Sequence, residues 1–180
     1  VLCKGLAVGQ RIATGKVRLI STPSPLEMSK VQPGDIVVAE MTTPSFTPIL
    51  KRAGAVVCEK GGRTSHASII AREFGLPAIV GADGAMTVLR EGQQVTVVCA
   101  AGSEGVVLEG KHDFCITRTP LDSSVLATRT DVKLIISDPS SALSAAQLPY
   151  CAGVGLVRLE FLLAEVVKVH PLALFHYPAY

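Results

Sequence analysis

The sequence has few aromatic residues, little charge and no long apolar run. Tryptophan is absent and aromatic residues make up 4% of the 180 positions, so no row of rings is available for stacking against nucleic-acid bases. The net charge of +2 is too small to indicate binding to nucleic acid or to an anionic membrane. The apolar runs are short and are interrupted by glycine, proline or charged residues, so none is long enough to span a bilayer.

Closely spaced cysteines are also missing. The five cysteines lie at wide, irregular intervals, without a C-x-x-C pair or a His/Cys spacing typical of zinc sites. Several fall inside apolar runs, where a cysteine usually acts as a small hydrophobic residue. This usage favours the cytoplasm. Since the chain lacks an initiator methionine and ends abruptly, we expect it to be a piece of a longer protein.

Apolar residues, in contrast, are abundant at 48%, against 18% charged, so the chain is expected to bury a core. Short apolar runs typical of strands recur at 36–39, 55–58, 78–80, 95–99 and 106–109, separated by glycine turns. Helical segments are predicted at 45–53 and 66–74. The pattern predicts an α/β fold, with a compact β/β/α domain over residues 1–110.

One glycine turn leads directly into a helix. Gly61-Gly62 is followed by Arg63-Thr64-Ser65-His66, and the helix is predicted to stop at Gly75. Thr64 or Ser65 can serve as the N-cap, because a hydroxyl oxygen can accept a hydrogen bond from an unpaired amide of the first turn. His66 then lies in that first turn, close to free N–H groups.

This placement suits His66 for phosphoryl transfer. The positive end of the helix dipole disfavours an imidazolium by ~0.3–1 kcal/mol, so the ring is expected to be neutral and nucleophilic near pH 7. The same amides can hold a phosphate, since helix starts bind anions. The chemistry indicated is transfer through a phosphohistidine. The alternative is a capping or solvated histidine, which is the commoner role of a lone histidine after a Gly-Gly turn.

The segment from Gly61 to Glu73, followed by 75–81, resembles the phosphohistidine signature of the PEP-utilising enzymes. This family includes phosphoenolpyruvate synthase, pyruvate phosphate dikinase and enzyme I of the sugar phosphotransferase system. The resemblance implies a swivelling domain that carries a phosphoryl group on His66 between two distant active sites. It also implies that Thr64 is a site of regulatory phosphorylation. The residues implied to hold the phosphate are Gly61, Gly62, Arg63, Thr64 and Ser65.

The remaining chain divides into a polar segment at 111–131, typical of an interdomain linker, and a second apolar region at 132–180. A strand is predicted at 132–136 and a helix capped by 138–141. Residues 152–163 resemble the stretch that opens the PEP/pyruvate-binding barrel of the family, so 132–180 is expected to be an N-terminal fragment of a truncated (β/α)8 barrel.

Within this fragment, the resemblance assigns Arg158 to PEP/pyruvate binding. The alternative for Arg158 is a surface ion pair with Glu160 or Glu165. His170 is expected to pack or cap beside Pro171. Leu159 and the His170-Pro171 pair favour the synthase branch of the family.

The resemblance therefore implies the central phosphoryl-carrier part of the synthase branch, which converts ATP, pyruvate and water to AMP, phosphoenolpyruvate and phosphate. The expected partners are an ATP-grasp domain and the complete barrel, in a full-length homodimer. Mg²⁺ is expected in parts of the parent enzyme outside this chain, and no metal ligand is predicted here. The alternatives are the dikinase or enzyme I, a non-catalytic β/β/α binding module, and an inactive relic.

Overall fold

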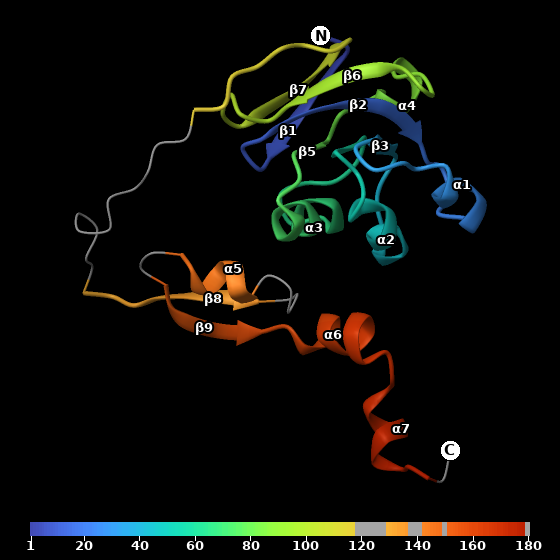
Figure 1. Ribbon diagram of the computed structural model, residues 1–180. Coiled ribbons are helices and arrows are strands. Elements are labelled where there is room, and N and C mark those ends of the chain that lie inside the picture. Colours follow the sequence, from blue (N-terminus) through green and yellow to red (C-terminus); the bar gives the residue numbers. More distant parts are fainter. Residues whose placement is uncertain (118–128, 137–141, 149–150, 179–180) are drawn as a thin grey trace. The chain divides into compact units, whose positions relative to one another are not determined.

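A computed structural model describes residues 1–117, 129–136, 142–148 and 151–178 (Figure 1). The chain divides into two compact units, Val1–Cys115 and Ile116–Tyr180, and each is described by itself. None of the helices in these residues has the length and apolar character needed to cross a membrane.

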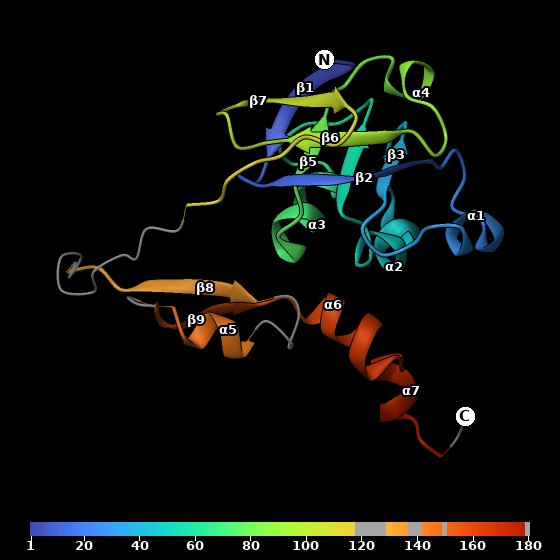
Figure 2. The ribbon, with the colours of Figure 1, turned by 45° about the horizontal axis from the view of Figure 1, so that its top comes forward.

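The first unit is built on a closed barrel, whose strand order is β1-β5-β4-β3-β2-β6-β7 (Figures 1 and 2). Neighbours from β2 to β5 pair in parallel, and the other pairs are antiparallel. Closure leaves no strand edge open for pairing with another chain. The strands are β1 (Cys3–Val8), β2 (Ile12–Leu19), β3 (Ile36–Ala39), β4 (Ala55–Cys58), β5 (Ala78–Val80), β6 (Gln94–Val98) and β7 (Glu104–Glu109).

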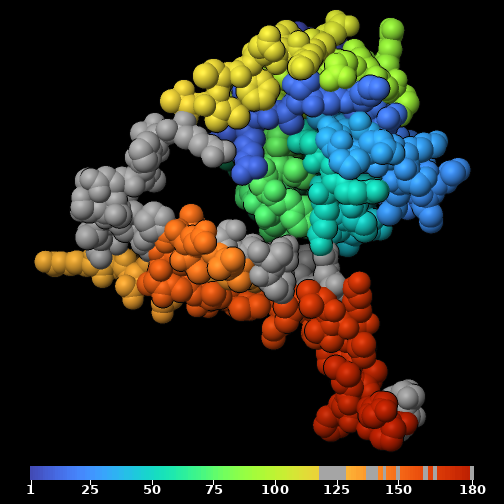
Figure 3. Space-filling view, in the orientation of Figure 1, coloured from blue at the N-terminus to red at the C-terminus, as the bar shows by residue number. Residues whose placement is uncertain are grey.

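Strands β3, β4 and β5 are buried on both faces, which explains their unbroken apolar sequences. Every residue of β3, β4 and β5 is buried. Ile36, Val38 and Val57 belong to the core cluster of the barrel. Helices α2 (Thr47–Leu50) and α3 (His66–Phe74) contact each other and lie side by side on the surface (Figure 3). Helix α3 also contacts β4 and β5. Two further short helices, α1 (Pro25–Ser29) and α4 (Ala85–Val88), complete the unit.

The strands predicted at 36–39, 55–58 and 78–80 and the helix at 66–74 are confirmed. The helix predicted at 45–53 is shorter. It consists of a 3₁₀ turn (Pro44–Phe46) and the single turn of α2, with prolines at the start of both. Because each proline lacks an amide hydrogen, a longer regular helix is disfavoured here. The α/β class is correct, but the layered β/β/α arrangement closes into a barrel, which periodicity alone does not predict.

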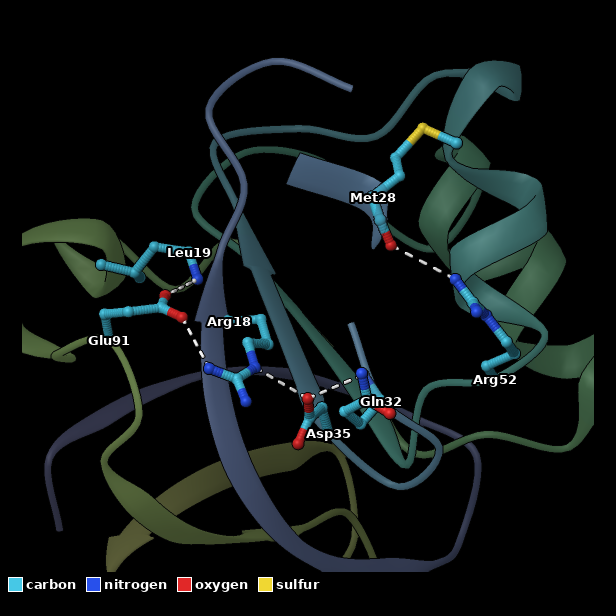
Figure 4. A network of polar contacts seen from close by, with 7 residues as sticks. All are labelled: Arg18, Leu19, Met28, Gln32, Asp35, Arg52 and Glu91. Atoms are coloured by element: carbon cyan, nitrogen blue, oxygen red, sulfur yellow. Dashed lines mark hydrogen bonds and ion pairs between the residues drawn. The ribbon is translucent and has the colours of Figure 1, made fainter. Parts of the chain in front are cut away.

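A polar network ties β2 to the start of β3 (Figure 4). Arg18 Nε donates to Asp35 Oδ2 at 2.7 Å, and Arg18 Nη1 donates to Glu91 Oε1 at 2.9 Å. The Asp35 carboxylate also accepts from the Gln32 N–H at 2.9 Å. Asp35 is buried, and its charge is compensated by these donors. The network therefore holds the amino end of β3 against β2, and the loops described below follow the carboxyl ends of β3 and β4.

The second unit contains a parallel pair, β8 (Val132–Ile136) and β9 (Cys151–Val157), with helix α5 (Ala142–Ala146) between them in sequence. It continues through α6 (Leu159–Leu162), a π-helical turn (Leu163–Val167) and α7 (Pro171–Phe175). The strand predicted at 132–136 is confirmed. The helix cap predicted at 138–141 and much of the predicted linker, at 118–128, lie outside the described residues. His170 caps α7, as predicted, because its Nδ1 accepts from the Leu172 N–H at 3.2 Å.

Gly15, on β2, is required by a close approach to the turn that precedes β3. A Cβ on Gly15 would lie 2.2 Å from the Gly34 carbonyl oxygen. The Gly15→Ala variant should therefore lose about 2–4 kcal/mol of unfolding free energy, because backbone atoms would have to move. Urea unfolding followed by NMR signals of the first unit measures this loss. Gly62→Ala is the matched control, since a Cβ there meets nothing within 4 Å. Equal midpoints for the two variants would contradict the prediction.

Candidate functional site

The candidate site lies where the parallel strands of the barrel end. Ala39 pairs in register with Cys58, and Cys58 with Val80, so β3, β4 and β5 end at the same edge. Carboxyl ends of adjacent parallel strands are common positions for binding sites. The segment after β3 contributes Thr42, and the segment after β4 contributes the glycine turn and His66.

The glycine turn is pressed against the start of α3. Gly61 has φ = 118°, and a Cβ there would lie 3.0 Å from both Cβ and Oγ of Ser65. Only glycine fits this conformation and this approach without strain. The Gly62 carbonyl oxygen accepts from the Ser65 N–H at 3.0 Å and from Ser68 Oγ at 2.7 Å. These contacts fix the path of the chain into the helix.

Ser65 occupies the N-cap position of α3, but its side chain makes no capping hydrogen bond. The predicted hydroxyl cap is therefore wrong. The reason is that Ser65 Oγ lies 3.2 Å from Ser68 Oγ and is held there. Its own N–H also donates to Gly62, so the N–H groups for an incoming anion must come from the neighbouring residues. Arg63 and Thr64, beside Ser65, are exposed.

His66 is the first residue of α3 and is held by one ring nitrogen. Its Nδ1 lies 3.1 Å from Thr42 Oγ1. Its Nε2 is buried and is the one buried side-chain N or O atom in the described ranges that has no hydrogen-bond partner. Burial lowers the pKa of His66, and the charge of Glu73 opposes this effect. The ring is thus neutral near pH 7, as predicted, although the first cause is burial rather than the helix dipole.

Thr42 links His66 to the end of β4. Thr42 is buried, and burial raises the pKa of the Cys58 thiol to about 12, an effect that a hydrogen bond from Thr42 opposes. The Thr42 hydroxyl oxygen has lone pairs that can accept a hydrogen bond from an Nδ1–H of His66. This pairing favours the tautomer whose lone pair is on Nε2, where a nucleophile needs it.

The role of Thr42 was not predicted from the sequence. It lies 24 positions before His66, and no spacing pattern connects the two residues. Only the course of adjacent strands β3 and β4 brings them together.

The other predicted site residues are surface or second-unit positions. Two other cations lie near His66 in the sequence but are not among the site residues predicted above: Arg72 is exposed, and Lys60 forms an ion pair with Glu40 beside the strand ends. Arg158 directly follows β9, and its N–H donates to the Ile136 carbonyl at 2.8 Å, so it lies at the carboxyl end of the parallel pair β8–β9. The side chains of Glu160 and Glu165 lie outside the described part of the chain, so the alternative ion pairs are not tested.

No magnesium site is formed by the residues whose positions are described. Among them, no three His, Cys, Asp or Glu side chains come together in a way that could hold a metal ion. The donor set that Mg²⁺ prefers, several oxygen ligands including carboxylates, is not assembled by these residues.

Comparison with known proteins identifies a family model and several relatives that this chain resembles. Residues 31–102 match the model of the "PEP-utilising enzyme, mobile domain". The chain is 45% identical over 177 residues to a phosphoenolpyruvate synthase of Pseudomonas aeruginosa, covering 98% of this chain and 22% of the relative. It is 46% identical over 178 residues to that of Deinococcus radiodurans, covering 99% and 22%. The chain therefore spans about a fifth of the length of these curated relatives.

A solution structure of Enzyme I matches 44% of this chain and 33% of its own, at 29% identity, but its TM-score of 0.38 is too low to bear on the fold. The match to the mobile domain includes the glycine turn, Thr42 and the whole of α3. Residues 31–102 are therefore similar to the mobile domain of the PEP-utilising enzymes, and His66 lies within this segment.

Proposed function

We propose that this chain is the central phosphoryl-carrier part of a phosphoenolpyruvate synthase, which converts ATP, pyruvate and water to AMP, phosphoenolpyruvate and phosphate. Its support is the 40–46% identity to proteins of that name over nearly the whole chain. The observation that carries the proposal is the neutral His66 ring, held at Nδ1 by Thr42 at the start of a helix.

The proposed chemistry uses Nε2 of His66 twice. In the first transfer its lone pair attacks the phosphorus of a phosphoryl group derived from ATP, an N–P bond forms, and the P–O bond to the leaving group breaks. In the second transfer the enolate oxygen of pyruvate attacks the same phosphorus and the N–P bond breaks. Because Nε2 is buried in the structure, the ring or the groups that cover it must move before either transfer.

The turn before His66 is proposed to hold the phosphate. The glycines at 61 and 62 let the backbone come close, the helix start offers N–H groups, and the exposed Arg63 can pair with the charge. Thr64 is exposed two residues before His66. A phosphate on Thr64 would repel an incoming phosphoryl group, which is the basis for proposing regulation there.

The second unit is proposed to begin the PEP/pyruvate barrel, with 111–131 as the linker. The support is the parallel order strand, helix, strand and the position of Arg158 at a carboxyl strand end, where barrel enzymes place active groups. Arg158 would grip the carboxylate or phosphate of the substrate. An ATP-grasp domain, a homodimer and a cytoplasmic location complete the proposal. Mg²⁺, held by other parts of the enzyme, would neutralise charge on the phosphates.

The dikinase and enzyme I would use the same His66 with another donor or acceptor. Incubation of the full-length protein with ATP and pyruvate separates them. Release of AMP and inorganic phosphate without added phosphate indicates the synthase, whereas a requirement for added phosphate indicates the dikinase.

The first prediction concerns the carrier residue. In the full-length protein, radiolabelled phosphoenolpyruvate should leave an acid-labile, base-stable label on His66. The His66→Ala variant should lose the label and more than about 10⁴-fold of synthesis, because the nucleophile is gone. His112→Ala, which alters an exposed histidine in the 111–131 segment, is the control. Undiminished synthesis by His66→Ala would disprove the carrier function.

The second prediction concerns Thr42. Thr42→Val keeps the shape of the side chain but removes the partner of Nδ1, so both neutral tautomers of His66 should become populated and phosphorylation should slow by about tenfold. Ring ¹⁵N chemical shifts and the labelling rate measure the two effects. Thr43→Val is the matched control, because Thr43 is exposed and bonds Ser45 instead. An unaltered tautomer in Thr42→Val would refute the role assigned to this contact.

The third prediction concerns pH. Burial lowers the pKa of His66 in the folded chain, so the unfolded chain takes up a proton first as the pH falls. The contribution of His66 to the free energy of unfolding therefore keeps its full value above the ordinary imidazole pKa of about 6.5. It decreases as the pH falls towards the pKa of His66 in the folded chain. NMR titration of the ring in the folded chain and in urea checks the direction. A folded pKa equal to or above the unfolded one would contradict it.

A further inference from the structure

Ser68 is a buried polar residue to which neither the sequence motif nor the proposed chemistry gives a role. It is fully buried on α3, two residues after His66. Its Oγ donates to the Gly62 carbonyl at 2.7 Å and lies 3.2 Å from Ser65 Oγ. Because a serine hydroxyl has a single proton, the contact with Ser65 must use the proton of Ser65.

Ser68 is not needed to satisfy the Gly62 carbonyl. That oxygen already accepts from the Ser65 N–H at 3.0 Å. A buried hydroxyl costs desolvation that a buried methyl group does not, so an alanine would fill this position without leaving the carbonyl unpaired. A purely structural role therefore gives a weak reason for a hydroxyl at this position.

The first effect of Ser68 is on the Gly62–Arg63 peptide. The Gly62 carbonyl oxygen accepts from the buried Ser68 Oγ at 2.7 Å and is therefore directed at this side chain. In a trans peptide the following N–H points in the opposite direction, so the Arg63 N–H points away from Ser68. The negative end of this peptide dipole therefore points towards the buried Ser68 hydroxyl, and its positive end points the other way.

The second effect is on Ser65. A serine at the N-cap ordinarily accepts a hydrogen bond from an amide of the first turn. Here the Ser65 hydroxyl is turned to Ser68 and makes no capping bond. The first-turn amides are therefore not capped by this side chain and remain available to an external acceptor.

We propose that Ser68 is a positioning residue that keeps the phosphate seat beside His66 open, by holding the Gly62 carbonyl inward and the Ser65 hydroxyl away from the first-turn amides. This inference rests on the proposed function, because only a phosphate-carrying His66 requires such a seat. Ser68 itself does not touch the phosphate.

The test uses the 180-residue chain and inorganic phosphate as the probe. Phosphate should shift the ¹⁵N–¹H signals of residues 63–67, and Ser68→Ala should weaken this binding by about fivefold, the loss expected when one supporting hydrogen bond is removed. The His66 titration without phosphate should stay unchanged. Thr96→Val is the matched control, because Thr96 is also buried and its Oγ1 donates to a glycine carbonyl, that of Gly110, at 2.9 Å. It should bind phosphate like the wild type.

Equal phosphate binding by Ser68→Ala and the wild type, or equal weakening by Thr96→Val, would overturn the inference. If Ser68→Ala does not fold, Ser68→Cys replaces it, since a thiol is a weaker donor of similar size and should also weaken binding. If the signals of residues 63–67 in the wild-type chain do not respond to phosphate, the proposed phosphate site beside His66 is refuted. The radiolabel on His66 in the full-length protein is unaffected by these outcomes, so failure of the seat and failure of the carrier function are distinguishable.

Discussion

The contact between Thr42 Oγ1 and His66 Nδ1, at 3.1 Å, is the interaction on which the site depends. A neutral imidazole has one nitrogen that donates and one that accepts, and the partner of Nδ1 decides which nitrogen keeps the lone pair. When Nδ1 donates to Thr42 Oγ1, the lone pair of the neutral ring lies on Nε2. Burial then keeps the ring uncharged.

The barrel makes this contact possible. Thr42 and His66 follow adjacent parallel strands, β3 and β4, whose ends are in register. At the other end of these strands, Arg18 and Asp35 tie β2 to the start of β3. The parallel register of β3 and β4, whose residues are all buried, sets the spacing of the two loops. The glycine turn adds a close approach to the start of α3, where Gly61 lies against Ser65.

The sequence predicts the elements of this fold better than their assembly. Unbroken apolar runs and Gly75, which ends α3 in the left-handed conformation, define the central strands and the carrier helix because these signals are local. The site is predicted at His66 and its glycine turn for the same reason. Barrel closure, the engagement of Ser65 by Ser68 and the pairing of Thr42 with His66 depend on contacts between distant segments, which a local pattern does not encode. The roles proposed for Arg158 and for the linker concern parts of the chain outside the barrel of the first unit.

The match of residues 31–102 to the mobile-domain model and the Thr42 contact both involve the segment that holds His66. A mobile domain that carries a phosphoryl group needs one nitrogen held and the other able to react, and the Thr42 contact distinguishes the two. The most direct measurement is ³¹P–¹⁵N coupling in the phosphorylated full-length protein with ¹⁵N-labelled histidine. The structure predicts coupling to Nε2 of His66. Coupling to Nδ1, or to another histidine, would contradict the account.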